Sequence, residues 1–190
     1  AGQMDVVVGV PTLNNVSTVG QVVREVHLAF TGPFKRDRTV LINFDAGSED
    51  GTPDIVRRAS LVESETLVAP QAFRTIHRIS SPYHGRPGKG GTLRALFAAA
   101  ELLDAKAVAL FDPDVTSMTA DWVERLVRPV FRDGFDYVAP AFMRHPTEGL
   151  LVTQLARPLV GAAYGHRMRE PLSSEFACSV RFASHCLAQD

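Results

Sequence analysis

Short apolar runs alternate with helix-forming segments along this sequence, and that alternation limits the possible folds more than any other feature. The first run, at 5–10, is rich in valine and closes at Pro11, which predicts a strand buried on both faces. Ser17 or Thr18 then caps a helix whose apolar residues fall at helical spacing. Repeated units of this kind predict an α/β fold with a mainly parallel sheet flanked by helices.

The remaining elements are predicted from the same signals. Further strands are expected at 39–44, 66–69, 107–111 and 136–142, and further helices at 54–60, 92–103, 119–131 and 148–164. Residues 79–91 contain several glycines and prolines, which predicts a loop. We expect Pro158 to kink or divide the last helix.

Length and charge limit the function classes. The 190 residues fit one domain, and 20 Lys+Arg against 21 Asp+Glu argue against a nucleic-acid or polybasic membrane surface. We find no apolar run of transmembrane length and no signal-peptide pattern. Cys178 and Cys186 lack the paired spacing of zinc or redox motifs, which predicts free thiols in a cytoplasmic protein. The expected partners are therefore small molecules.

Two carboxylates follow the predicted strand at 107–111. Pro113 favours an extended conformation at Asp112, and residues two apart in an extended chain point to the same side, so Asp112 and Asp114 can converge on one object. Hard anionic oxygens suit Mg²⁺ or Mn²⁺ shared with a substrate phosphate. The alternative is that the two residues only end the strand and shape a turn.

A positively charged segment surrounds the predicted loop. Between Glu65 and Glu101 there is no acidic residue, whereas Lys89 and four arginines are present. Free N–H groups at the start of the helix predicted at 92–103 add partial positive charge, which suits a phosphate. The alternative is a solvated basic loop that happens to precede a helix.

The turn after the first strand reads Pro-Thr-Leu-Asn-Asn at 11–15, which is not a glycine-rich dinucleotide fingerprint. Such a polar turn can present backbone groups and Asn side chains to a nucleobase. Asp45 ends the second strand, where an acidic residue often accepts hydrogen bonds from a nucleotide's ribose or base. Its alternative role is that of a turn former.

In their order and spacing, these segments resemble the GT-A glycosyltransferases of the family-2 type. The matching segments are Val-Gly-Val-Pro-Thr-Leu-Asn-Asn at 8–15, Phe-Asp-Ala-Gly-Ser-Glu-Asp-Gly-Thr at 44–52, Arg-Pro-Gly-Lys-Gly at 86–90 and the DxD motif Asp-Pro-Asp at 112–114. Within that family the run at 114–122 and Pro-Leu-Ser-Ser-Glu-Phe at 171–176 are similar to segments of glucosyl-3-phosphoglycerate and mannosylglycerate synthases. The resemblance covers nearly the whole chain and implies a GT-A, Rossmann-like fold.

The resemblance also implies an activity and a set of site residues. The implied enzyme is a metal-dependent glycosyltransferase that moves a hexose from a UDP- or GDP-hexose to a small acceptor such as glycerate or 3-phosphoglycerate, with retention of configuration. The implied binding residues are Pro11, Thr12, Leu13 and Asn15 for the nucleoside, Asp45 for base or ribose, Gly88 and Lys89 for the diphosphate, and Asp112 and Asp114 for the sugar nucleotide and its Mg²⁺ or Mn²⁺. Asp114, Glu175 and Lys89 are the implied catalytic residues, with Glu175 near the transferred sugar.

The sequence departs from the family pattern in several places. Ala46 stands where many relatives have Asp or Ser, Gly91 where the synthases often have an acidic residue, and the pair at 173–174 is Ser-Ser where glycine is usual. The chain stops at Asp190, before the region in which the family supplies a metal-binding His and much of its acceptor site. We therefore expect 1–190 to be a nucleotide-sugar-binding domain without its C-terminal acceptor portion, and a homodimer is expected from the resemblance alone.

Two other functions stay open at this point. The same pocket can hold a nucleotide sugar without turnover, as a binding module. A sugar nucleotidyltransferase also uses a positive glycine-rich loop and Mg²⁺, but it usually places that loop after the first strand, whereas here it follows the third.

Overall fold

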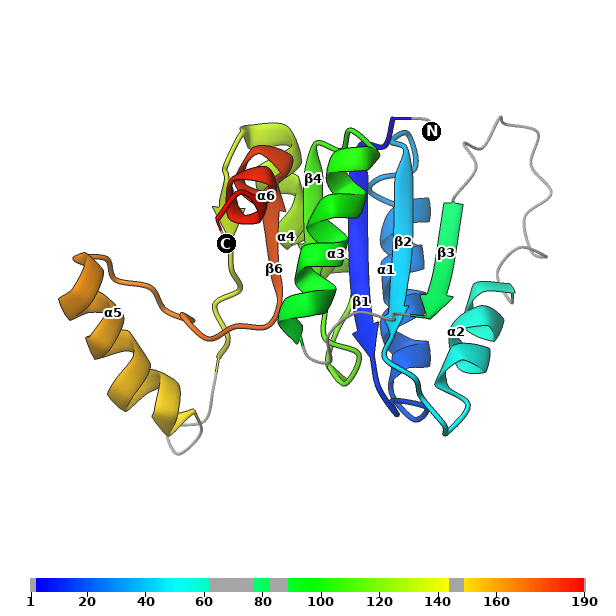
Figure 1. Ribbon diagram of the computed structural model, residues 1–190, viewed down its shortest axis with the longest axis horizontal. Coiled ribbons are helices and arrows are strands. Elements are labelled where there is room, and N and C mark those ends of the chain that lie inside the picture. Colours follow the sequence, from blue (N-terminus) through cyan, green and yellow to red (C-terminus); the bar gives the residue numbers. More distant parts are fainter. Residues whose placement is uncertain (1–2, 62–76, 83–88, 144–148, 190) are drawn as a thin grey trace.

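The computed structural model describes residues 3–61, 77–82, 89–143 and 149–189 of the chain (Figure 1). The strands are β1 (Val6–Thr12), β2 (Thr39–Asp45), β3 (His77–Pro82), β4 (Ala107–Leu110), β5 (Tyr137–Val138) and β6 (Phe176–Ser179). The helices are α1 (Val19–Thr31), α2 (Thr52–Leu61), α3 (Lys89–Leu102), α4 (Ala120–Asp133), α5 (Arg157–Tyr164) and α6 (Val180–Leu187), and a π-helical segment η1 (Leu151–Ala156) directly precedes α5.

The strands form one six-stranded sheet in the order β3-β2-β1-β4-β6-β5. The first four strands in that order are parallel to one another, whereas β6 is antiparallel to both of its neighbours. The predicted α/β fold with a mainly parallel sheet is therefore confirmed. The carboxyl ends of β1, β2 and β4 lie at the same edge of this sheet, the lower edge in Figure 1.

Helices cover both faces of the sheet because its central strand is apolar on both sides. Val6, Val8 and Val10 of β1 are fully buried in a core shared with α1 and α4. Val7 points to a second core, shared with α3 and α6. Each such valine contributes about 1.5–3 kcal/mol relative to an exposed one, before the entropy of ordering the chain is counted. The predicted burial of this strand on both faces is confirmed.

The prediction of a loop over 79–91 is wrong at both ends. Residues His77–Pro82 form β3, and α3 already begins at Lys89 rather than at Thr92. This polar stretch becomes a strand because it pairs in parallel with β2 at the edge of the sheet. A proline is tolerated at the end of an edge strand, since no further strand needs its N–H group. The strand predicted at 66–69 lies outside the described residues.

Two other predicted elements are shorter or less regular than expected. The strand predicted at 136–142 is limited to Tyr137–Val138, after which the chain leaves the sheet toward Pro140, whose nitrogen has no hydrogen to donate. The helix predicted at 148–164 is divided as expected, into η1 and α5. Pro158 cannot donate the α-helical hydrogen bond to residue 154, which accounts for the irregular register before it.

Strand β6 and helix α6 were not predicted from the sequence. The strand is only four residues long and becomes visible through its pairing with β4, Leu110 opposite Phe176. The helix carries a recognisable signal, since the Ser179 hydroxyl accepts a hydrogen bond from the Phe182 N–H at 3.1 Å. Cys178 lies buried in β6, and both cysteines are free thiols, as predicted. Burial, followed by the effect of Cys186, raises the pKa of the Cys178 thiol to about 12.

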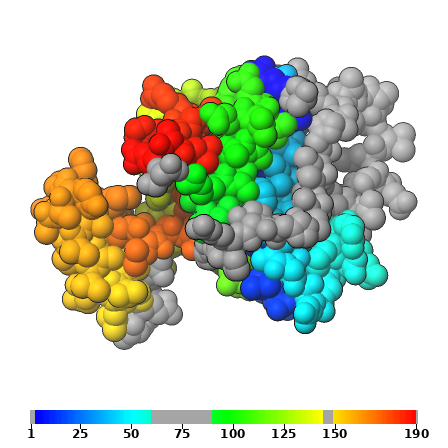
Figure 2. Space-filling view, in the orientation of Figure 1, coloured from blue at the N-terminus to red at the C-terminus, as the bar shows by residue number. Residues whose placement is uncertain are grey.

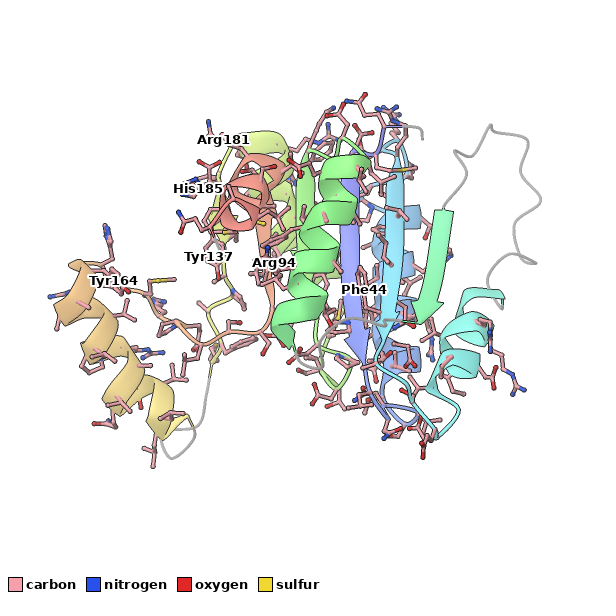
Figure 3. All side chains as sticks on the ribbon, in the orientation of Figure 1. Phe44, Arg94, Tyr137, Tyr164, Arg181 and His185 are labelled. Atoms are coloured by element: carbon pink, nitrogen blue, oxygen red, sulfur yellow. The ribbon has the colours of Figure 1, made fainter. Side chains whose placement is uncertain are left out.

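The segment from η1 through α5 projects away from the sheet (Figures 1 and 2). No residue of α5 is buried, and Leu155 of η1 and Leu159 and Tyr164 of α5 are 57–73% exposed. Figure 3 labels Tyr164 on this helix, apart from the sheet. One ion pair holds its first turn, between Arg157 Nη2 and Glu170 Oε1 at 3.3 Å. Among the described helices, none combines the length and apolar character needed to cross a membrane.

Close contact between β1 and α3 makes Gly9 a sensitive position. A Cβ atom at Gly9 would lie 2.6 and 2.8 Å from the two methyl groups of Leu96, which is itself fully buried. We expect Gly9→Ala to lower the free energy of unfolding by about 1–3 kcal/mol, measured by urea denaturation. Gly90→Ala is the control, because a Cβ there meets nothing within 4 Å. It should leave stability unchanged or raise it, and equal effects of the two substitutions would contradict this packing.

Candidate nucleotide-sugar site

A cleft of about 270 Å³ opens at the carboxyl ends of β1, β2 and β4, beside the first turn of α3. Open parallel sheets bind ligands in this position, because the loops that leave the strands meet there. The residues that line the cleft are Pro11, Thr12, Leu13, Asn15, Phe44, Ala46, Thr92, Asp112, Pro113 and Asp114. The structure therefore brings together the predicted nucleoside-binding residues of the first turn and both predicted metal-binding carboxylates.

Buried polar groups fix the ends of β1 and β2 against each other. The Asn43 amide donates to the Val10 carbonyl and to Thr12 Oγ1, both at 3.0 Å, and the Thr12 hydroxyl donates to Asp45 Oδ1 at 2.9 Å. Asn43, Thr12 and Asp45 are 0%, 3% and 7% exposed. Because unsatisfied buried polar groups are costly, this network holds Thr12 in one orientation beside the cleft.

The Asp45 carboxylate also organises the turn that follows β2. Its Oδ2 accepts hydrogen bonds from the backbone N–H groups of Gly47 at 3.1 Å and Ser48 at 2.9 Å, and its Oδ1 accepts one from the Ser48 hydroxyl at 2.6 Å. Burial raises the pKa of Asp45, but the hydrogen bonds from Ser48, Thr12 and Gly47 outweigh it and leave this pKa below its ordinary value. Asp45 thus acts as a turn former, and its contact with base or ribose stays a prediction.

Side chains from the α2 region hold the loop between β1 and α1. The N–H groups of Asn14, Asn15 and Val16 donate to Ser48 Oγ, Thr52 Oγ1 and Asp50 Oδ2 at 2.8–3.0 Å. Asn14 adopts a left-handed conformation with φ of 56°, which asparagine tolerates better than most residues. This loop is therefore ordered by the protein itself and presents Leu13 and Asn15 to the cleft.

Asp112 and Asp114 reach the cleft from the end of β4. Pro113 between them is buried, Asp112 is half-buried and Asp114 is exposed. Both carboxylates line one cavity. The extended conformation predicted for this segment is wrong, because Pro113 and Asp114 form a turn, and that the two carboxylates hold a metal stays a prediction. Among the described residues, no group of three or more His, Cys, Asp or Glu side chains gathers as a metal site. Two carboxylates with substrate phosphate and water are the ligand set that Mg²⁺ favours, so the donor set present fits such an ion.

Helix α1 braces the loop that carries these carboxylates, which the sequence did not reveal. The Gln21 amide donates to the Thr116 carbonyl at 2.8 Å, and Glu25 Oε2 accepts from the Ala120 N–H at 2.9 Å. Met118 of the same loop is buried. Gln21 and Glu25 lie on the polar side of an amphipathic helix, where a sequence pattern indicates solvent exposure rather than contact with a distant loop.

The other predicted site residues differ in what the structure shows of them. Lys89 is the first residue of α3, but its side chain and Gly88 lie outside the described part of the chain. Thr92 lines the cleft from the first turn of α3, which turns the positive end of this helix toward it. Glu175 is 7% exposed, and its Oε2 accepts from the Ser173 hydroxyl at 3.1 Å. The pairing of Leu110 with Phe176 places Glu175 at the same sheet edge as Asp112.

The fold is that of the GT-A glycosyltransferases. The sequence profile of glycosyl transferase family 2 matches residues 7–183, so the chain belongs to this family. No protein with a curated description matches the sequence.

Solved structures of glucosyl-3-phosphoglycerate synthase from Mycobacterium tuberculosis are similar to this chain. One holds Mn²⁺, UDP and glucosyl-3-phosphoglycerate, with 26% identity and a TM-score of 0.67. A second holds Mg²⁺ and UDP (26%, 0.66), and a third Mn²⁺, UDP-glucose and phosphoglyceric acid (27%, 0.66). Each match covers 94% of this chain but only 57% of the solved chain, so the present chain spans little more than half the length of these structures.

The Asp45 network yields a stability prediction. Asp45→Asn replaces an acceptor-only carboxylate by an amide that can accept at one atom only, so we expect the free energy of unfolding at pH 7 to fall by about 1–3 kcal/mol. The folded-state pKa of Asp45 lies below 3.8, so the ionised group stabilises the fold above that pH. The difference in the free energy of unfolding between wild type and Asp45→Asn should become smaller as the pH falls through the folded-state pKa of Asp45.

Thermal unfolding between pH 2.5 and pH 7 measures this difference. Asp54→Asn is the matched control, because Asp54 is exposed on α2 and forms an ion pair with Arg57 of the same helix. Its effect should stay within about 0.5 kcal/mol. A pH-independent cost of Asp45→Asn, or an equal cost of both substitutions, would contradict the role assigned to Asp45.

Proposed function

We propose that this chain is the nucleotide-sugar-binding domain of a metal-dependent glycosyltransferase. The donor is a UDP- or GDP-hexose, and the acceptor is a small hydroxylated acid such as glycerate or 3-phosphoglycerate. The observation that carries the proposal is the convergence of Asp112 and Asp114 with the 11–13 turn on one cleft of a family-2 chain. The UDP, Mn²⁺ and Mg²⁺ held by the similar synthase structures support it.

In this proposal different parts of the cleft bind different parts of the donor. Pro11, Thr12, Leu13 and Asn15 hold the nucleoside, while Asp45 keeps Thr12 in place and contacts base or ribose. Gly88, Lys89 and the N–H groups of the first turn of α3 face the diphosphate. Asp112 and Asp114 would hold Mg²⁺ or Mn²⁺ together with phosphate oxygens, and the bound ion supplies positive charge against the leaving diphosphate.

The transfer exchanges one bond of the sugar for another. The bond between the anomeric carbon and the β-phosphate oxygen breaks, and its electron pair leaves with the nucleoside diphosphate. An acceptor hydroxyl oxygen forms the new bond to the anomeric carbon, and its proton passes to the leaving phosphate. Lys89 and the α3 N–H groups stabilise the negative charge that develops, which is the largest single contribution to such catalysis.

The stereochemical course is proposed to be retention. With the leaving phosphate as proton acceptor, no side-chain base is required, and we assign none. Glu175 does not line the cleft, but it lies at the same sheet edge as Asp112, and in this proposal it faces the transferred sugar. Its hydrogen bond from Ser173 fixes the carboxylate in position.

A binding module without turnover is the second candidate, because the chain spans only 57% of the synthase structures that it resembles. Incubation with UDP-glucose, Mn²⁺ and glycerate or 3-phosphoglycerate separates the two, since only the enzyme releases UDP together with a glycosylated acid. Membership of family 2 disfavours the sugar nucleotidyltransferase. A cytoplasmic location and a homodimer stay predictions, and the exposed leucines of η1 and α5 (Leu151, Leu155 and Leu159) offer an apolar surface for the latter.

Calorimetric titration with UDP and with GDP, each with and without Mn²⁺, tests the donor site. We expect metal-dependent binding of one nucleotide, weakened about tenfold or more in Asp114→Asn, because a charged ligand atom is lost. Asp133→Asn is the matched control, since Asp133 is exposed at the far end of α4, and it should bind as the wild type does. Absence of binding, or equal binding by Asp114→Asn, would contradict the assignment of the cleft.

A further inference from the structure

A second and larger cavity lies beside α4, the helix that follows the Asp112–Pro113–Asp114 loop. It is a groove of about 620 Å³ between α4 and the chain at 138–143. This volume falls within the range of about 300–1,000 Å³ that is usual for small-molecule sites. None of the predicted site residues lines it, so the donor proposal leaves it without a role.

One wall of the groove is aromatic. Trp122 and Phe142 face each other with ring centroids 5.6 Å apart and planes inclined at 44°. Met143, beside them, is fully exposed. Trp122 packs at the same time against the core beneath α4, which holds its ring in place. The groove is therefore lined by two aromatic side chains, one of which is anchored in the core.

The rim of the groove is polar but carries no net charge. Asp121 and Arg125 are its only charged residues in the described part of the chain, and they pair with each other, Arg125 Nε to Asp121 Oδ2, at 2.6 Å. Both side chains are more than half exposed and thus within reach of a ligand. Ser117, in the turn that precedes α4, adds a hydroxyl.

We propose that this groove binds a neutral sugar ring carried by the acceptor. A pyranose has an apolar face of C–H groups, which fits the Trp122–Phe142 wall, and an edge of hydroxyl groups. Each hydroxyl both donates and accepts, so it can bond the acceptor-only carboxylate of Asp121 and the donor-only guanidinium of Arg125. A small anion gains little there, because the charge of Arg125 is already compensated.

The position of the groove fits the acceptor side of the reaction. Asp114 lines the donor cleft and Ser117 lines the groove, and three residues of chain span at most about 11 Å. The groove therefore begins within about 11 Å of a proposed metal-binding residue, measured along the loop from Asp114 to Ser117. The inference rests on the proposed function in this respect, and it extends the acceptor class from small acids to sugar-bearing acceptors.

The groove carries its own reporter, because Trp122 is the single tryptophan of the chain. We expect methyl α-D-glucopyranoside or trehalose to change its fluorescence in a saturable way, without nucleotide or metal. Arg125→Ala should raise the dissociation constant about tenfold, through the loss of a charged hydrogen-bond donor. 3-Phosphoglycerate should leave the emission unchanged.

Arg128→Ala is the matched control. Arg128 lies on the same helix and pairs with Glu124 at the same spacing as the Arg125–Asp121 pair, but it does not line the groove. It should bind the saccharide as the wild type does. The inference is overturned if neither saccharide changes the emission, if Arg125→Ala binds as tightly as Arg128→Ala, or if only 3-phosphoglycerate binds. Nucleotide titration of the same sample shows independently whether the donor site is intact.

Discussion

Parallel pairing of β1 with β2 and β4 is the constraint on which the rest of the structure depends. β1 is apolar on both faces, so it occupies the middle of the sheet and requires helices on either side. Because its neighbours run in the same direction, the chain leaves all three strands at one edge. Three loops therefore lie next to one another around the cleft: the turn at 11–15, the turn after Asp45 and the Asp112–Asp114 loop. The cleft is a consequence of strand order.

Polar contacts convert that meeting of loops into a fixed surface. Asn43, Thr12 and Asp45 join two strand ends through buried hydrogen bonds, and Gln21 and Glu25 of α1 hold the third loop from outside. Charge is concentrated at this edge in two forms, as carboxylates at the end of β4 and as the positive end of α3. The carboxylates suit a divalent ion and the positive helix end suits phosphates, so a ligand that brings both fits this edge. The proposed sugar groove lies further along the same segment of chain, and the charges on its rim compensate each other.

The parts predicted from sequence are those that local chemistry decides. Successive valines predict β1 as a buried strand, and the apolar run that ends at Phe111 predicts a strand end at which Asp112 and Asp114 lie. The extended conformation predicted at 112–114 is not found, because Pro113 and Asp114 form a turn. β3 and β6 were not found, since their residues become strands only through pairing with β2 and β4. Gln21 and Glu25 were missed for the same reason, because their roles arise from helix α1 packing beside the Asp112–Asp114 loop. The groove at Trp122 joins segments about 20 residues apart and leaves no local pattern.

Paramagnetic broadening of backbone amide signals by Mn²⁺ tests the central claim most directly, namely that the cleft holds a divalent ion and a nucleoside diphosphate together. With UDP or GDP present, sub-stoichiometric Mn²⁺ should broaden the amides of residues 112–116 and the 11–15 turn before any others. Without nucleotide, the effect should be much weaker, because the chain supplies only two carboxylates in the described part of this cleft. Broadening centred on other surface carboxylates, such as Asp50 and Asp54, or independent of nucleotide, would contradict the account.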